Sequence, residues 1–118
     1  MYQQLYGETA QDSAATAREI ECKAFERANR LLSGAQKSSP DSSEFNEALR
    51  YLEDLWSVLL EDLILPENGL SKDLRAKLVS IGIWTLKRSA AIREGAGHDF
   101  QAFIEINNSM LSGLRGRT

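Results

Sequence analysis

The chain has 118 residues, 42% of them apolar and 26% charged, and a formal net charge of −3 at neutral pH. That length and composition indicate one ordinary globular domain, residues 1–118, and exclude wholesale disorder, while the acidic balance argues against nucleic acid as a partner. Without an apolar run of about 20 residues, a signal-peptide pattern or a second cysteine besides Cys22, the sequence predicts a cytoplasmic protein that does not enter a membrane.

The sequence contains only two prolines, and its long stretches free of proline and glycine predict an all-α fold, a small bundle of about four helices. A partly extended N-terminal tail is expected over residues 1–13, which are polar and precede any helix signal. The first helix is predicted over residues 16–33, where apolar residues recur at helical spacing. Thr16 and Glu19 have the spacing of a capping box at its start, and Gly34 offers a stop at its end.

The second helix is predicted over residues 43–63 and is the clearest of the four. Apolar residues alternate there in steps of four and three, which produces a continuous seam along one face. The seam consists of Phe45, Leu49, Leu52, Trp56, Leu59 and Leu63.

The third helix is predicted over residues 71–94, after a turn signalled by proline, asparagine and glycine. Ser71 is its expected N-cap, and its apolar residues fall on more than one face, with Trp84 between them. A helix of this pattern needs cover from several sides, so it is predicted to be the central member of the bundle. Gly82 in its middle is interpreted as a place where a neighbouring helix approaches closely, in preference to a functional kink.

The fourth helix is predicted over residues 99–114, with Asp99 as its N-cap. Its apolar stripe contains one amide, Asn107. The sequence leaves open whether Asn107 is a buried amide with a partner in the bundle or a polar contact at a binding edge.

Charge is distributed unevenly along the second and third helices. Residues 41–67 hold eight acidic residues and one basic residue, whereas residues 68–98 hold six basic and two acidic residues. Since short loops make neighbouring helices antiparallel, the acidic second helix is predicted to lie along the basic third helix. This interpretation is favoured over the alternative, in which Lys72, Arg75 and Lys77 meet an acidic partner.

The sequence offers no recognisable arrangement for catalysis or metal binding. His98 is the only histidine and Cys22 the only cysteine, so a Cys/His zinc site within one chain is excluded. A Cys22–His98 nucleophile pair is disfavoured because Cys22 lies within a predicted helix, where small buried cysteines are common. No phosphate-binding, dinucleotide-binding or calcium-binding motif is present. The protein is therefore predicted not to be an enzyme and to need no cofactor or metal.

Several aromatic residues are candidates for partner binding. Tyr2, Leu5 and Tyr6 stand in the polar N-terminal tail, where aromatic residues pack back onto the domain or anchor a partner. Core packing is the favoured interpretation for both Trp56 and Trp84, because apolar stripes more often face the bundle than a partner. The alternative is a groove between helices that accepts an amphipathic helix.

Three segments form a pattern that goes beyond helical periodicity: the opening MYQQLYG, the stretch LPENGLSKDLRAKLVSIGIWTLKR and the closing FIEINNSMLSGLRG. The most specific features are Pro66, Glu67 and Asn68 followed by Leu70, the Leu74–Arg75 pair with Leu78, and Lys87 with Arg88; Ile106–Asn107 and Gly113–Leu114 support them. Together these segments resemble the flagellar biosynthesis regulator FlaF family of alphaproteobacteria over nearly the whole chain. None of the features is a catalytic signature.

The resemblance implies a small cytoplasmic protein needed for flagellin production and export, acting alongside a second regulator, FlbT, which represses flagellin translation. Flagellin termini are amphipathic and disordered before assembly, so a helical protein with an apolar groove would bind them by coupled folding. The predicted function is a flagellin-binding, chaperone-like factor that promotes flagellin secretion and flagellum assembly and regulates flagellin synthesis. The alternatives are an adaptor that binds FlbT without holding flagellin and, disfavoured by the acidic balance, a protein that binds flagellin messenger RNA.

The partner-binding residues are predicted to lie in the tail and in the 66–88 region. They are Tyr2, Leu5, Tyr6, Pro66, Asn68, Leu70, Leu74, Arg75, Leu78, Trp84, Lys87 and Arg88. Flagellin is the expected partner and a FlbT-like regulator the second.

Overall fold

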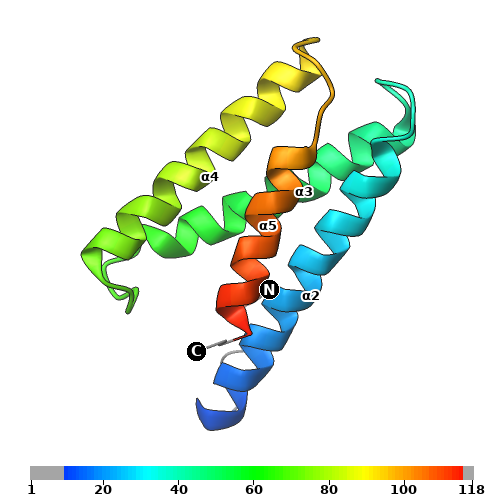
Figure 1. Cartoon of the computed structure of the whole chain (residues 1–118). Helices are drawn as coiled ribbons and strands as arrows, with labels where there is room; N and C mark the ends of the chain where they lie inside the picture. The colour runs from blue at the N-terminus through cyan, green and yellow to red at the C-terminus, as the bar shows by residue number, and fades with distance from the viewer. Residues whose placement is uncertain (1–9, 116–118) are drawn as a thin grey trace.

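The computed structural model describes the backbone of residues 10–115 and the side chains of residues 16–115. This part of the chain folds into four α-helices and contains no strand (Figure 1): α2 (Ala10–Ala35), α3 (Ser43–Leu63), α4 (Lys72–Arg93) and α5 (Gln101–Leu114). The predicted all-α bundle is confirmed. Over the same residues, no helix is both long and apolar enough to cross a membrane.

The first helix, α2, extends beyond its predicted bounds at both ends. It begins at Ala10 and ends at Ala35, so the tail predicted over residues 1–13 is wrong from residue 10 onward, and Thr16 is not a cap. Alanine-rich sequence before Thr16 has enough helix propensity to extend the helix, and a Thr–Glu pair is also tolerated inside one. Gly34 lies within the last turn and does not stop the helix.

The second helix, α3, has its predicted bounds. The Oγ of Ser42 caps its start by accepting a hydrogen bond from the backbone N–H of Phe45 at 3.2 Å. The predicted seam is buried at Phe45, Leu49, Leu52, Trp56 and Leu63 and half-buried at Leu59. One side of α3 packs against α2 and another against α4, so α3 has helical neighbours on two sides.

The third helix, α4, is not the central member of the bundle, and that prediction was wrong. Its principal helical contact is α3, while α2 packs between α3 and α5. In Figure 1, α4 lies at one side of the molecule, away from α2. The prediction assumed that apolar residues on several faces of this helix must be buried. Folded proteins expose much apolar surface, so the apolar character of a residue does not by itself show that it is buried.

The fourth helix, α5, begins at Gln101, whereas Asp99 as the N-cap would have made Phe100 its first residue. Phe100 occupies the N-cap position, and Asp99 precedes it with its Oδ1 accepting a hydrogen bond from the Gln101 N–H at 2.9 Å. The Phe100 ring is buried against Phe45, with ring centroids 5.1 Å apart. This packing fixes the backbone at the start of α5, and Asp99 stabilises only the local turn that leads into the helix.

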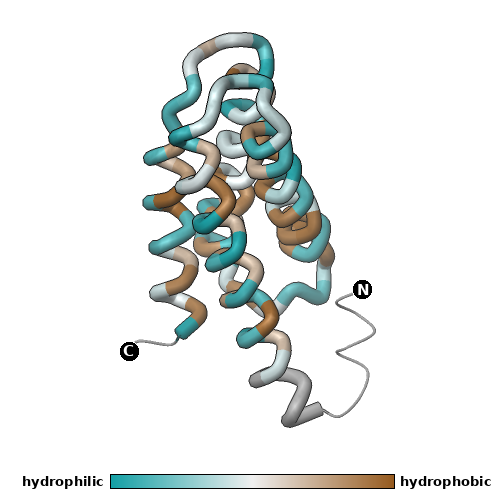
Figure 2. Tube along the Cα trace, turned by 90° about the vertical axis from the view of Figure 1, so that its right-hand side faces the viewer, coloured by the Kyte–Doolittle hydropathy of each residue, from teal (hydrophilic) through white to brown (hydrophobic). Residues whose placement is uncertain are grey.

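The core lies where α2, α3 and α5 meet, and aromatic rings fill much of it. Phe25 of α2 meets Trp56 of α3 edge to face at 6.1 Å between centroids. The open question about Asn107 is settled by burial, because its Nδ2 donates to Oδ1 of Asn29 at 2.9 Å and no part of the residue is exposed. Figure 2 shows polar and apolar residues interleaved along each helix, as amphipathic packing requires.

Candidate partner-binding surface

The contact between α3 and α4 contains the close approach predicted at Gly82. A Cβ added to Gly82 would lie 2.8 Å from Cδ2 of Leu60 and 3.0 Å from the Trp56 ring. The first distance is shorter than real Cβ contacts and the second is tighter than most of them, so a side chain at this position would force Leu60 or Trp56 to shift. The prediction of close approach is confirmed.

A charged clasp joins the same two helices near the C-terminal end of α4. The Glu53 carboxylate accepts hydrogen bonds from Ser89 Oγ at 2.5 Å and from Arg93 Nε and Nη2 at 2.8 and 3.0 Å. Burial acts to raise the pKa of Glu53, but the hydrogen bonds from Arg93 and Ser89 outweigh it and hold that pKa below its ordinary value. The predicted pairing of the acidic second helix with the basic third helix is confirmed at this point.

The α3–α4 turn is held by side chains that were predicted to bind a partner. Asn68 donates from Nδ2 to the Asp62 carboxylate at 2.9 Å, and its Oδ1 accepts from the Leu70 N–H at 3.1 Å. Arg75 donates from Nη1 to the carbonyl oxygen of Leu65 at 3.1 Å. Both residues therefore stabilise the turn, which fixes where α4 begins.

A similar backbone contact involves Arg88 at the other end of α4. Its Nη2 donates to the carbonyl oxygen of Ala96 at 3.2 Å, in the loop that leads to α5. Gly95 and Gly97 in this loop have φ values of 96° and 93°, which glycine adopts without strain. Arg88 thus ties the loop to α4.

Exposed apolar side chains gather along residues 70–84. The large apolar residues that the described structure leaves exposed are Val58, Ile64, Leu70, Leu74, Ile83 and Trp84. Three of these six belong to α4, and Ile64 and Leu70 lie in the turn before it. By contrast, the buried residues of α4 are Gly82, Thr85, Ser89 and Ile92, of which only the last is a large apolar residue. Apart from Ile92, the fully buried residues of α4 are small, while Leu74, Ile83 and Trp84 are exposed and its other large apolar residues are half-buried.

Trp84 links this exposed surface to the core. Its ring meets Phe103 of α5 edge to face at 5.9 Å between centroids, yet 44% of the residue remains exposed. The core packing favoured for Trp84 is therefore wrong, whereas Trp56 is fully buried as predicted. The two rings have the same chemistry, and only the position of α4 at the side of the bundle separates them.

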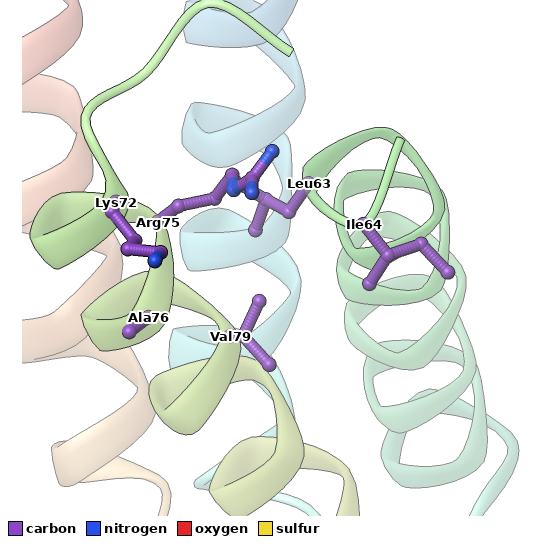
Figure 3. Close-up of a pocket in the computed structure, with 6 residues that line it drawn as sticks. All are labelled: Leu63, Ile64, Lys72, Arg75, Ala76 and Val79. Carbon is purple, nitrogen blue, oxygen red and sulfur yellow. The ribbon is translucent and has the colours of Figure 1, made fainter. Parts of the chain in front are cut away.

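An open depression of about 270 Å³ lies where α3 ends and α4 begins. Figure 3 shows its lining residues, with Arg75 reaching from α4 toward Leu63. They are Leu63, Ile64, Lys72, Arg75, Ala76 and Val79. The floor is apolar and the cations come from α4, so the depression continues the mixed apolar and basic character of that helix.

The predicted partner-binding residues are thus divided by the structure. Pro66, Leu70, Leu74, Trp84 and Lys87 are exposed and available to a partner, and Leu78 is half-buried. The predicted binding residues Tyr2, Leu5 and Tyr6 lie outside the described part of the chain.

Sequence reasoning missed Ile83 and Ile64 as surface residues. Ile64 is 70% exposed, and Ile83 stands beside Trp84 on the outside of α4. The sequence carried a signal for Ile83, because α4 has more apolar residues than a single packing face against α3 can cover.

The catalytic alternatives gain no support from the geometry. Gln36 donates from Nε2 to the carbonyl oxygen of His98, which places His98 near the C-terminal end of α2. Cys22 of α2 lies 14 residues before Gln36, a separation of about 21 Å along the helix axis. The described side chains include no group of three or more potential metal ligands.

Taken together, these features define a small helical-bundle protein with a basic and apolar helix face left open, a surface typical of protein recognition. Comparison with protein families matches residues 2–114 to the family described as flagellar protein FlaF. The chain belongs to this family, and a role in flagellar biogenesis follows. Comparisons with curated proteins and with solved structures give no match.

Proposed function

We propose that this protein is a flagellin-binding, chaperone-like factor of the cytoplasm that promotes flagellin secretion and flagellum assembly and regulates flagellin synthesis. It acts by binding and not by catalysis. The single observation that carries the proposal is the set of exposed large apolar residues on α4 and the turn before it, in a member of the FlaF family.

The physical support comes from the kind of cargo that an exposed apolar helix face suits. A disordered amphipathic segment gains a folded conformation and buries its apolar stripe when it docks on a preformed helix face. Covering the stripe removes an aggregation hazard while the cargo awaits export. The bundle offers such a face on α4 because α4 packs against α3 and leaves Ile83 and Trp84 nearly half exposed.

The test is co-purification of the full chain with monomeric flagellin, followed by competition with isolated flagellin terminal segments. The proposal predicts a stable complex that terminal segments displace. A chain that fails to retain monomeric flagellin at micromolar concentrations of both proteins would exclude a holding function.

The alternative is an adaptor that binds a FlbT-like regulator and not flagellin. The same experiment separates the two, because FlbT is offered in place of flagellin under identical conditions. Retention of FlbT alone supports the adaptor, and retention of flagellin, with or without FlbT, supports the chaperone-like function.

A further inference from the structure

We propose that the outer face of α4, which consists of Ala76, Lys77, Ser80, Ile83, Trp84 and Lys87, binds an amphipathic helix whose apolar stripe is flanked by acidic residues. This inference rests on the proposed function, because the amphipathic helix would belong to the flagellin that this protein binds. All six residues are exposed. At 100° per residue they share one side of α4, opposite the side that carries Gly82, Ser89 and Leu78.

The shape of this face suits a helix. Ala76 and Ser80 are small and lie one turn apart, and the larger Ile83 and Trp84 follow on either side of the same line. A partner helix can seat side chains over the small residues and between the two large ones, which is ridge-into-groove packing. From Ala76 to Lys87 the face is about 17 Å long, or three turns of helix.

The charges on the face select the partner. α4 contains six basic residues and one acidic residue, Asp73. Arg93 is engaged by Glu53, and Arg75 and Arg88 each bind a backbone carbonyl. Within the described part of the chain, Lys77 and Lys87 have no side-chain hydrogen bond or ion pair. Two lysines beside exposed apolar residues therefore favour carboxylates at the edges of the incoming helix.

The opposite side of α4 already packs against an acidic amphipathic helix within the bundle. There α4 packs against α3, an amphipathic helix with six acidic residues and one basic residue. Apolar contacts fill the middle of that interface, and the ion pair between Glu53 and Arg93 lies at its edge. The outer face repeats this combination of apolar and basic residues, and within the described chain only the Trp84 ring has an aromatic contact, with Phe103 of α5.

A second copy of this chain matches the face less well. Two α4 helices packed face to face would bring lysines against lysines, which like-charge repulsion disfavours. The outside of α3 has the acidic charge but offers Val58 as its one large exposed apolar residue among residues 43–63. An acid-flanked helix from another protein supplies both the charge and the apolar stripe.

The test uses the full chain and two synthetic peptides of about 14 residues, four helical turns. Both peptides carry the same leucine stripe, and one is flanked by Glu while the other is flanked by Lys. Titration calorimetry should show the Glu-flanked peptide binding at least about tenfold more tightly at low salt, with the difference shrinking as salt is raised.

Charge-reversal variants locate the site. The Lys77→Glu/Lys87→Glu chain should bind the Glu-flanked peptide about tenfold more weakly than the wild type, and Ile83→Asp should reduce the affinity further. Arg30→Glu, an exposed cation on α2, and Val58→Ser, an exposed apolar residue on α3, are the matched controls and should bind like the wild type. Circular dichroism of each variant confirms that the helices are retained.

Several results would overturn the inference. They include equal affinity for the two peptides or no binding of either, a loss of binding in the controls as large as in the α4 variants, and a concentration-dependent dimer that Ile83→Asp abolishes. A gain in Trp84 exposure to iodide in the Tyr2→Ala/Tyr6→Ala variant would also overturn it, by assigning the face to the chain's own first residues. Failure to hold flagellin, measured separately, would refute the proposed function while the peptide result still decides the site.

Discussion

α3 and α4 are adjacent helices of 21 and 22 residues, yet they use their apolar residues in different ways. α3 buries phenylalanine, tryptophan and three leucines along its seam, and Leu55 beside it. α4 buries Gly82, Thr85 and Ser89 against α3 and leaves Ile83 and Trp84 at the surface. The difference shows that α3 lies in the interior of the bundle, whereas α4 contacts α3 through small residues, buries Ile92 near its end, and leaves Ile83 and Trp84 nearly half exposed.

The manner of docking explains how α4 remains ordered although Ile92 is the only large apolar residue that it buries fully. Gly82 permits close backbone approach, and the Glu53–Ser89–Arg93 clasp fixes the C-terminal half. At the other end, Asn68 and Arg75 hold the turn from α3. These polar contacts fix the position of α4 without consuming the apolar surface that a partner would use.

The largest expected effect separates the two tryptophans. Trp56→Ala should cost about 3–5 kcal/mol of unfolding free energy, because it opens a cavity in the core. Trp84→Ala should cost less than about 2 kcal/mol, since nearly half of the residue is exposed. Urea unfolding followed by circular dichroism measures both, and equal losses would contradict the different placement of the two rings.

The clasp should make stability depend on pH. The folded-state pKa of Glu53 is lowered from 4.5, so the ionised carboxylate adds to the free energy of unfolding above pH 4.5. This stabilisation is lost as the pH falls through the folded-state pKa. Glu53→Gln should therefore cost about 1–2 kcal/mol at pH 7 and flatten the stability profile between pH 5 and pH 3, ranges set by that shift.

Asp54→Asn, the exposed acidic neighbour on α3, controls for the loss of one negative charge. It removes no contact with Ser89 or Arg93. A stability profile that is unchanged in Glu53→Gln would show that the clasp does not stabilise the α3–α4 contact.

Substitution of Gly82 should destabilise the docking of α4 despite improving helix propensity. Alanine gains about 1 kcal/mol over glycine in a helix interior, but overpacking against Leu60 and Trp56 costs about 1–3 kcal/mol. The expected net result for Gly82→Ala is a loss of about 1 kcal/mol in chemical unfolding.

Ser80→Ala is the matched substitution on the exposed side of α4. It should stabilise slightly, by about 0.5 kcal/mol, because propensity rises with no contact to disturb. If Gly82→Ala stabilised the protein as Ser80→Ala does, the close approach of α3 and α4 would be refuted.

The smallest stability effect is expected on the outer face itself. Ile83→Ser should change the unfolding free energy by no more than about 0.5 kcal/mol, as surface substitutions do, while weakening partner capture. Thermal unfolding and flagellin pull-down on the same preparation measure the two properties. A large drop in thermal stability would instead assign Ile83 to the packing of the bundle.

The sequence predicted best where one pattern had one structural meaning. The seam of α3 gave the helix bounds directly, and the single glycine in an otherwise regular helix marked the contact at Gly82. The start of α2 was missed because Thr16 and Glu19 satisfy a capping-box spacing and are equally tolerated inside a helix.

The candidate site was only partly predictable for a different reason. Leu74 and Trp84 were identified from their sequence context, but Asn68 and Arg75 were assigned to binding although their side chains hold the turn. Periodicity reports which faces of α4 are apolar and not which of them a neighbour covers. That depends on the packing order of the helices, which places α4 beside α3 at the side of the bundle.

The most direct test of the account is the accessibility of Trp84 to solvent with and without cargo. A Trp56→Phe chain leaves Trp84 as the sole tryptophan, and it removes an indole N–H that has no hydrogen-bond partner in the described structure. The account predicts that iodide quenches Trp84 in the free chain and that monomeric flagellin shields it. A Trp84 that is shielded before flagellin is added, or is quenched equally after it binds, would contradict an open face on α4 that serves partner binding.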